Sequence, residues 1–361
     1  MYRKTFTFEG KRYSVNGKTQ EELYERIARK KMELEQGYNR ICKNTPVSKW
    51  AEEWLDIYKA PSVSSTWYKN IKHIVERIIL PEIGNLQLKD VKPIHLQRIL
   101  NKYSSYSKSY IRKIYNIICE MFKIAKQNNL LRENPAENLS MPKGRKKDKR
   151  RSITPKERKY ILQTADKHRA GLFIKIMLYC GLRPGEVAAL QWRNIDFKRI
   201  SLTVDSALKG DGTMGEPKSD AGYRTIPIPE ALYSELITVK GNPFDYVCTN
   251  AGGGRLTNSS IKQMWKSFVY NLNIEMGCKT YKGGLVPPYP VADDLVMYCL
   301  RHTYCTDLQA AGVPINVARE LMGHSDISVT AEIYTHSSEE SFSQAANAIN
   351  ELINKRNCSS I

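Results

Sequence analysis

Residues 171–186 read GLFIKIMLYCGLRPGE, and this stretch sets the local fold on both sides of a turn. Its first ten positions are almost all apolar, which predicts a buried helix that ends at Gly181, because glycine is a common helix stop. Pro184 suits the first position of a second helix. Arg183 is then fixed at the junction, where its planar guanidinium can face a phosphate; an ion pair with Glu186 is the alternative.

The chain around this turn alternates between helical and strand patterns. Strand patterns over 199–205 and 222–228 flank a glycine-rich loop, KGDGTMGEPKSDAG. Helical patterns open at Thr154–Pro155 and recur at 259–272, 295–311 and 314–322. Together these patterns predict a mixed α+β domain over residues 152–340. The tail, residues 341–361, has the spacing of one apolar helical face, which suits packing on its own domain or docking on a neighbouring copy.

A small unit with a different pattern begins the chain. Residues 5–15, TFTFEGKRYSV, alternate around Glu9-Gly10 and predict a β-hairpin. Thr19 followed by Glu22 is a capping-box pattern, which opens a helix that we expect to end at Gly37. Residues 1–40 therefore form a hairpin-plus-helix unit.

Residues 45–140 are helical in pattern throughout, with Pro81 and Gly84 expected to close one of four or five short helices. The segment after them, MPKGRKKDKRR at 141–151, has seven basic residues and one acidic residue, so we expect an exposed basic linker. The predicted fold class is multidomain and mainly α with α/β parts.

The positive charge is concentrated ahead of the α+β domain. The chain has 361 residues and a net charge of +19. Residues 1–151 hold 33 Lys and Arg against 16 Asp and Glu, a net +17, whereas residues 152–361 hold 23 against 21, a net +2. This asymmetry indicates a polyanion-binding front half. Nucleic acid is favoured over an acidic membrane surface, because no amphipathic Lys-rich helix carries Trp or Phe on its opposite face.

Nine basic side chains are candidate DNA contacts, although solvation alone explains any one of them. They are Lys69, Lys72, Arg112, Lys113, Arg145, Lys146, Lys147, Arg150 and Arg151. The eight cysteines form no C-x-x-C pair and have no His at a zinc-ligand spacing, so no metal site is predicted. No apolar run of about 20 residues and no apolar signal core is present, so we expect a cytoplasmic protein.

Three more motifs join GLRPGE as candidates for chemistry. Lys218, in EPKSDAGYRTIPIP, stands at the edge of a predicted hairpin, where a mobile lysine can deliver a proton. The other two are CLRHTYCTDLQAAG at 299–312 and LMGHSDISVTAEIYTH at 321–336. Each motif alone favours a plain reading, such as packing for Tyr334 and for His302. In this order and spacing the four motifs resemble the tyrosine recombinase (phage integrase) family.

The resemblance implies a role for each matching residue. Tyr334 would be the nucleophile that forms a 3′-phosphotyrosine, and Arg183 and Arg301 would clamp the scissile phosphate. Lys218 would protonate the departing 5′-hydroxyl, His324 would hydrogen-bond the phosphate, and Glu186 would support the site.

One position departs from the family pattern, which has His three residues before the second arginine. Tyr298 stands there instead. A tyrosine hydroxyl donates a hydrogen bond to phosphate but does not titrate near neutrality, so base work assigned to that His in relatives is in doubt here.

The resemblance also implies an architecture and partners. Residues 1–40 would be an arm-type DNA-binding domain, 45–140 a core-site-binding domain and 152–340 the catalytic domain. The enzyme would act on double-stranded DNA attachment sites as a homotetramer, with a directionality factor and a host DNA-bending protein as further partners, and without metal, cofactor or ATP. The host element is a prophage or a conjugative transposon. A DNA-binding protein without catalysis and a type IB topoisomerase are the alternatives; the complete catalytic set argues against the first, and the arm-like N-terminus against the second.

Overall fold

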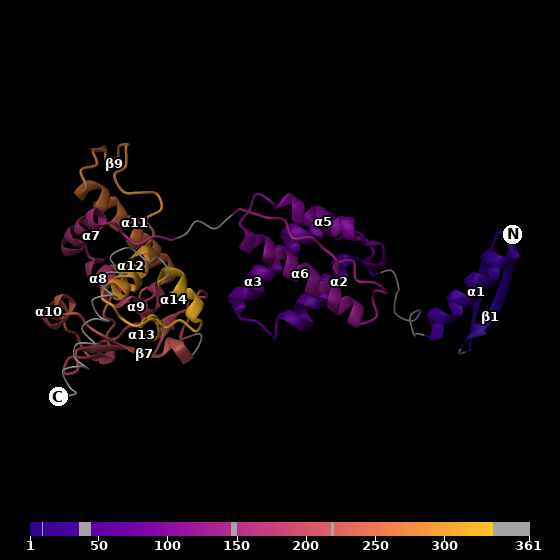
Figure 1. The fold of residues 1–361 in the computed structure, drawn as a ribbon, viewed down its shortest axis with the longest axis horizontal. Coiled ribbons are helices and arrows are strands. Elements are labelled where there is room, and N and C mark those ends of the chain that lie inside the picture. Colours follow the sequence, from indigo (N-terminus) through magenta and orange to yellow (C-terminus); the bar gives the residue numbers. More distant parts are fainter. Residues whose placement is uncertain (9, 36–44, 146–149, 218–219, 335–361) are drawn as a thin grey trace, which may run out of the picture. The chain divides into compact units, whose positions relative to one another are not determined.

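The protein is described from a computed structural model that covers residues 1–361 except 9, 36–44, 146–149, 218–219 and 335–361. The chain divides into two compact units, Met1–Asp148 and Lys149–Ile361, and each is described by itself (Figure 1). The predicted end of the first helix at Gly37, the whole 341–361 tail, Lys146, Lys147 and Lys218 lie outside the described residues.

The first unit begins with the predicted hairpin. Strands β1 (Tyr2–Phe8) and β2 (Lys11–Gly17) pair antiparallel, from Tyr2 opposite Gly17 to Phe8 opposite Lys11. Helix α1 (Gln20–Glu35) follows, and the predicted Thr19 cap forms: the Thr19 hydroxyl accepts from the Glu22 amide at 3.2 Å. The Glu22 carboxylate accepts from the Lys18 amide at 2.7 Å rather than from the Thr19 amide that a standard capping box uses.

The rest of the first unit is helical, as predicted. It contains α2 (Val47–Trp54), α3 (Ser65–Ile74), α4 (Leu80–Ile83), α5 (Pro93–Lys102) and α6 (Lys108–Gln127), with π-helical turns over Leu55–Lys59 and Val75–Ile79. Their buried faces share one core that includes Trp54, Phe122 and Ile114. Helix α3, the π-helical turn and α4 form one continuous run that ends at Ile83 with Gly84 as its cap, so the predicted end of this helix is confirmed. Pro81 lies in the last turn of the run, directly after the π-helical turn.

The basic segment after this core is anchored at its first end. The Arg145 amide donates to Tyr106 O at 2.8 Å, and Arg145 O accepts from the Lys108 amide at 3.1 Å. Gly144 has a positive φ of 63°, and a Cβ there would come within 2.7 Å of Ile111 Cδ1. Residues 144–145 are therefore fixed against the start of α6 rather than free in solvent.

The second unit is the predicted mixture of helices and short strands. Its helices are α7 (Pro155–Lys167), α8 (Gly171–Cys180), α9 (Pro184–Ala189), α10 (Glu230–Thr238), α11 (Asn258–Glu275), α12 (Met297–Ala310), α13 (Ile315–Met322) and α14 (Ile327–Tyr334). An antiparallel sheet has the order β3 (Ile195–Asp196), β4 (Ser201–Val204), β7 (Arg224–Pro227), which confirms the two predicted strands.

Two small hairpins in this unit were not predicted. They are β5 (Ala207–Leu208) with β6 (Met214–Gly215), and β8 (Thr280–Tyr281) with β9 (Gly284–Leu285). A two-residue strand is too short to show the alternation that marks a strand in a sequence.

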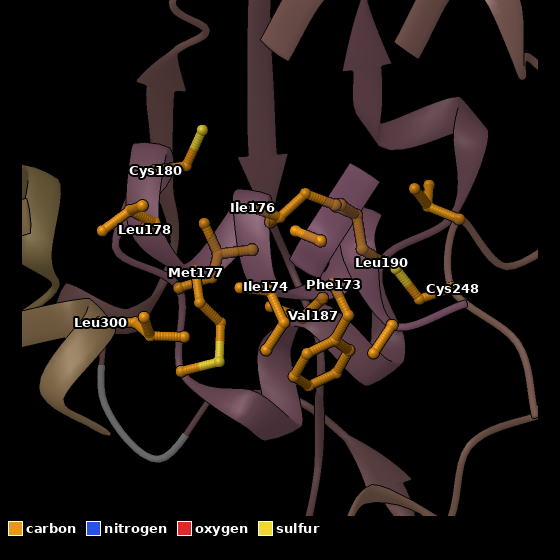
Figure 2. Close-up of a cluster of buried hydrophobic side chains, with 14 of the residues drawn as sticks. Phe173, Ile174, Ile176, Met177, Leu178, Cys180, Val187, Leu190, Cys248 and Leu300 are labelled. Carbon is orange, nitrogen blue, oxygen red and sulfur yellow. The ribbon is translucent and has the colours of Figure 1, made fainter. Parts of the chain in front are cut away.

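Helix α8 runs through the core of the second unit, as its apolar sequence predicts. Figure 2 shows Phe173, Ile174 and Met177 of this helix among side chains from other elements, including Val187 of α9 and Leu300 of α12. The core thereby fixes the C-terminal end of α8, from which the GLRPGE turn departs.

Candidate catalytic site

The turn after α8 positions Arg183. Gly181 ends the helix with a φ of 64°, and a Cβ there would lie 2.1 Å from Tyr304 Cδ1, so only glycine fits. Arg183 directly precedes Pro184 and α9, as predicted. Its guanidinium donates to Glu186 Oε1 at 2.6 Å and to Gly323 O at 2.9 Å, and its side chain remains 36% exposed. Arg183 thus lies at the predicted junction between α8 and α9 and also forms the ion pair with Glu186 that was considered as the alternative.

Glu186 lies beneath this arginine and binds more than one cation. Its carboxylate accepts from the Arg183 amide at 2.8 Å and from both terminal nitrogens of Arg224, at 3.2 and 2.8 Å. Arg301 Nη1 is 3.9 Å away. Burial alone raises the pKa of Glu186, but the Arg224 hydrogen bonds and the charges of Arg224, Arg301 and Arg183 lower it to about 2. The carboxylate is therefore ionised and holds three arginines together.

Arg301 enters the same cluster from α12. It is buried, and its guanidinium donates to Gly181 O and Met322 O. Burial and the neighbouring Arg183 lower its pKa, whereas Glu186 raises it. Arg301 therefore joins the end of α8 to the end of α13.

The end of α13 meets the cluster through three consecutive backbone carbonyls. Gly323 is left-handed (φ 62°), and the amides of Gly323 and His324 close the helix by donating to Glu320 O and Arg319 O. The next three carbonyls each accept from a different arginine: Leu321 O from Arg224 at 2.8 Å, Met322 O from Arg301, and Gly323 O from Arg183. Cations favour the negative end of a helix, so this turn is held electrostatically.

His324 follows this turn and faces the arginines. Its Nδ1 lies 2.9 Å from the hydroxyl of the buried Thr330. Burial, followed by the charges of Arg301, Arg183 and Arg224, lowers the pKa of His324 to about 4. The imidazole is therefore neutral at pH 7 and acts as a hydrogen-bonding group rather than a cation.

Tyr334 ends α14, and its hydroxyl faces a loop. The hydroxyl donates to Val313 O at 3.3 Å, and the backbone carbonyl of Tyr334 accepts from Gln309 Nε2 at 3.1 Å. The ring packs against the cluster that contains Cys305 and Met322. Burial and the nearby Cys305 raise the pKa of Tyr334 to about 12, so the phenol is protonated in this arrangement.

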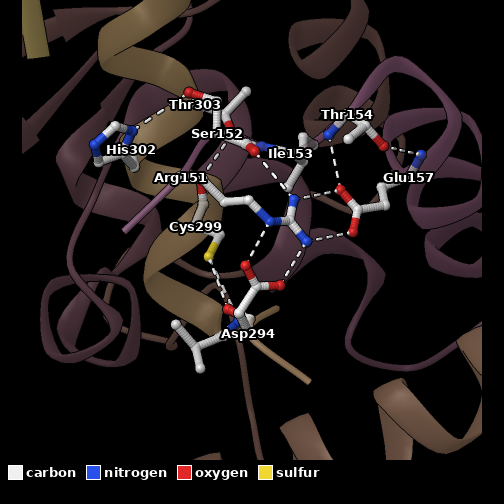
Figure 3. Close-up of polar contacts among 10 residues, drawn as sticks. Arg151, Ser152, Ile153, Thr154, Glu157, Asp294, Cys299, His302 and Thr303 are labelled. Carbon is white, nitrogen blue, oxygen red and sulfur yellow. Dashed lines mark hydrogen bonds and ion pairs between the residues drawn. The ribbon is translucent and has the colours of Figure 1, made fainter. Parts of the chain in front are cut away.

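Tyr298 lies in the first turn of α12, one turn before Arg301, and is 38% exposed. The Arg150 guanidinium lies 4.5 Å from the centre of its ring, a cation–π distance. His302, by contrast, lies near the Ser152 hydroxyl, 3.3 Å from its Nδ1, in the polar group of Figure 3. His302 is therefore packed within the protein, as the sequence analysis expected.

Arg151, one of the candidate DNA contacts, is bonded within the protein in this structure. All five of its N–H donors are used: two bonds go to Glu157, two to Asp294 and one to Ser152 O, at 2.7 to 3.1 Å (Figure 3). No donor remains for a DNA phosphate. Arg151 instead fixes the start of the second unit, next to the Thr154 cap of α7.

The other described candidates for DNA contact are exposed on the surface of their own units. Lys69 and Lys72 lie on α3, Arg112 and Lys113 on α6. Lys113 Nζ is 5.7 Å from the centre of the Trp67 ring, and Lys72 is 3.7 Å from Glu76, so two of the four have weak partners that leave them accessible. Arg145 and Arg150 are likewise exposed.

Arg224 is the site residue that sequence reasoning missed. Its side chain is 1% exposed, and it donates four hydrogen bonds within the cluster. The register of β7 carried a signal: Arg224 and Ile226 occupy the buried positions of the strand. A charged residue in the inward register of a strand is rare unless it is paired.

Two further observations concern the described residues as a whole. None of their helices combines the length and apolar character needed to cross a membrane. Nor do they bring three or more His, Cys, Asp or Glu side chains together in a way that could hold a metal ion.

With the geometry described, comparison with known proteins places the chain. Residues 151–341 match the model of the phage integrase family, and residues 47–104 match the N-terminal SAM-like domain of phage integrases. A XerC-like tyrosine recombinase of Caldanaerobacter subterraneus subsp. tengcongensis is 25% identical, with 93% of this chain and 90% of the relative covered. The transposase of transposon Tn916 from Enterococcus faecalis is 23% identical over 78% of this chain and 72% of its own length.

Solved structures with the same fold include two integrases bound to DNA. The Tn1549 transposon integrase in complex with circular intermediate DNA has a TM-score of 0.65 at 19% identity, covering 84% of this chain and 99% of that one. A lambda integrase dimer bound to a COC′ core site has a TM-score of 0.59 at 14% identity, covering 93% of each chain.

A helical SAM-like domain followed by an α+β domain with an arginine cluster and a helix-end tyrosine is the arrangement of a DNA strand-exchanging enzyme. The chain belongs to the phage integrase family, and it is a site-specific DNA recombinase that integrates or excises a mobile element.

Proposed function

We propose that the protein cleaves and rejoins DNA through a 3′-phosphotyrosine formed on Tyr334. The observation that carries this proposal is the convergence of Arg183, Arg301 and His324 on one turn above the buried Glu186. Two fixed guanidinium groups beside a neutral imidazole can bind the non-bridging oxygens of a phosphodiester and stabilise the charge that develops on the five-coordinate phosphorus.

In the proposed reaction the Tyr334 oxygen bonds to phosphorus, and the bond from phosphorus to the 5′-oxygen breaks. Lys218 gives its proton to that 5′-oxygen, and rejoining reverses the transfer. Since the Tyr334 hydroxyl is bonded to Val313 O, it must leave that carbonyl before it attacks. Once it lies near the arginines, their charge favours the phenolate, and the phenol proton is released to solvent water as the oxygen attacks. The phosphotyrosine conserves the energy of the phosphodiester, so neither ATP nor a metal ion is needed.

The remaining roles follow the charge distribution. Residues 1–40 would bind arm-type DNA sites, 45–140 core sites, and the basic segment around 141–151 would follow the phosphates between domains through Arg145, Lys146, Lys147 and Arg150. The exposed Lys69, Lys72, Arg112 and Lys113 would contact core-site phosphates. The active form would be a homotetramer on two DNA sites in the cytoplasm of a bacterial cell, assisted by a directionality factor and a host DNA-bending protein.

Tyr334→Phe tests the nucleophile directly. On a nicked suicide substrate, the wild-type protein should form a covalent protein–DNA adduct, and the variant should form none while binding core-site DNA with unchanged affinity in a gel-shift assay. The variant removes only a hydroxyl, so folding and binding serve as internal controls. A full-strength adduct from Tyr334→Phe would show that another residue attacks.

A further inference from the structure

Arg224 and Arg301 are both buried, and Arg224 differs from Arg183 in what it can reach. Arg183 is 36% exposed on its side chain, whereas the Arg224 side chain is 1% exposed and reaches no surface. A bound DNA phosphate therefore has access to Arg183 but not to Arg224. The hydrogen bonds of Arg224 all go to other groups of the protein. Arg224 can therefore affect the reaction only by positioning those groups.

Those groups belong to separate segments that each carry a site residue. Arg224 Nε donates to Leu321 O, in the last turn before His324. Its terminal nitrogens bind both oxygens of Glu186, which in turn binds Arg183. Nη1 also donates to Gly222 O at 3.1 Å, in the turn that follows the Lys218 segment.

The fit around Arg224 is close on the side of the His324 turn. A Cβ at Gly323 would come within 2.8 Å of Arg224 Nη1 and 2.9 Å of Ala221 O. The left-handed backbone at Gly323 thus lies against the Arg224 side chain and the turn over Asp220–Gly222 that precedes β7. Of the three carbonyls that precede His324, Leu321 O is the one that accepts from the most deeply buried arginine.

We infer that Arg224 is a positioning residue that holds the His324 turn and Glu186 in place while Arg183 and Arg301 bind the scissile phosphate. This role rests on the proposed function of the same site. In this division, Arg183 and Arg301 bind the phosphate, and Arg224 holds the surrounding protein groups in place. A planar guanidinium suits this task, because it bonds a carboxylate and a carbonyl in fixed directions, which an ammonium group cannot do.

Hydrogen exchange provides a first test that needs no activity. In Arg224→Met, the His324 amide, which donates to Arg319 O, should exchange at least about tenfold faster in a peptide that spans residues 319–327. Arg224→Lys should restore part of the protection. Lys175→Met is the matched control: Lys175 is 12% exposed and pairs with Asp166 and Glu235 in the same unit, so this variant also loses a buried cation but should leave that peptide unchanged.

A double-mutant cycle on a nicked suicide substrate provides the second test. Arg224→Met should slow adduct formation about a hundredfold, because a misplaced turn displaces the catalytic geometry, while gel-shift affinity is retained. Because Arg224 acts through both the His324 turn and Glu186, Arg224→Met combined with His324→Ala should be slower than His324→Ala alone but faster than the product of the two single effects predicts. Fully multiplicative effects would contradict the link between Arg224 and His324.

Two results would overturn the inference. The first is a wild-type exchange rate for the 319–327 peptide in Arg224→Met. The second is full restoration of both the exchange rate and the adduct rate by Arg224→Lys, because Arg224 would then act only by neutralising the charge of Glu186. Failure of the proposed function looks different. In that case the wild-type protein forms no adduct, while the exchange experiment still decides the role of Arg224.

Discussion

At the scale of single residues, His324 shows how burial sets chemistry. Its pKa is lowered to about 4 by burial and by the surrounding arginines, with Glu186 opposing them. The folded protein therefore keeps a neutral imidazole over a range where the unfolded chain takes up a proton. A neutral His can donate one hydrogen bond to phosphate without adding charge to a site that already contains three arginines.

This shift predicts a pH effect on stability. Above pH 6.5 the imidazole is neutral in both states, so its environment has no effect there. As the pH falls from 6.5 to about 4, the unfolded state gains a proton that the folded state resists, and the free energy of unfolding decreases by no more than about 3 kcal/mol. His324→Gln should lose less stability over this window in urea denaturation at pH 7, 5 and 4. An equal loss in both proteins would contradict the lowered pKa.

Tyr298 leads to a prediction about the departure from the family pattern. Its hydroxyl is the one group on this side chain that can donate to phosphate, so Tyr298→Phe should reduce cleavage, by about tenfold for one lost hydrogen bond to a charged group. Tyr298→His should keep activity. The ring contact with Arg150 survives in Tyr298→Phe, which makes that variant a clean test of the hydroxyl. Cleavage rates on the suicide substrate measure the effect, and an unchanged rate in Tyr298→Phe would mean that the Tyr298 hydroxyl has no role in cleavage.

At the scale of elements, the site is built from the ends of helices. The end of α8 presents Arg183, the end of α13 presents His324, and the end of α14 presents Tyr334. Both α8 and α13 stop at a left-handed glycine, so the chain can turn sharply and leave its last carbonyls for arginines. The helix ends thus supply both the placement and part of the electrostatics.

Gly181→Ala should disturb this arrangement strongly. The new Cβ would lie 2.1 Å from Tyr304 Cδ1 in a left-handed backbone, and Gly181 O binds Arg301. We expect a loss of about 2–4 kcal/mol in the free energy of unfolding and a lower cleavage rate.

Gly212→Ala is the control, because its φ is also positive, at 88°, but nothing lies within 4 Å of the added Cβ. Strain alone should lower its stability by about 1 kcal/mol. Thermal denaturation compares the two variants, and equal melting temperatures would mean that the contact with Tyr304 is unimportant.

At the scale of the whole molecule, charge is divided between binding and catalysis. The net +17 of residues 1–151 suits salt-sensitive binding to DNA. The second half has a net charge of only +2, and three of its arginines gather around Glu186. Arg151 is an exception within the basic segment, since its charge is neutralised by Glu157 and Asp294.

Removal of residues 1–40 should flatten the salt dependence of DNA binding without ending cleavage at core sites. Each lost phosphate contact lowers the slope of log K against log salt by about 0.9. Binding titrations at several salt concentrations measure the slope, and adduct formation on a core-site substrate is the control. An unchanged slope would rule out a DNA contact by this segment.

Local patterns in the sequence were sufficient for several elements. The hairpin around Glu9-Gly10, the Thr154 cap and the stop at Gly181 depend on residues close together in the chain, so composition and spacing predict them. The order of the GLRPGE, LRHTY and GHSDIS…EIYTH motifs was likewise enough to indicate the family, which the comparisons confirmed.

What only the tertiary structure decided involves partners far apart in the chain. Glu186, Arg224 and Leu321 meet because α9, β7 and α13 pack together. The alternation of β7 puts Arg224 on the buried face of the strand, but it does not reveal which groups Arg224 binds there. The same holds for the Tyr334 hydroxyl on Val313 O and for the ion pairs that occupy Arg151. Sequence alone therefore determined which residues are available for the chemistry, and the fold decided that Arg183 stays accessible while Arg224 and Arg301 are buried, because burial and long-range hydrogen bonds exist only after packing.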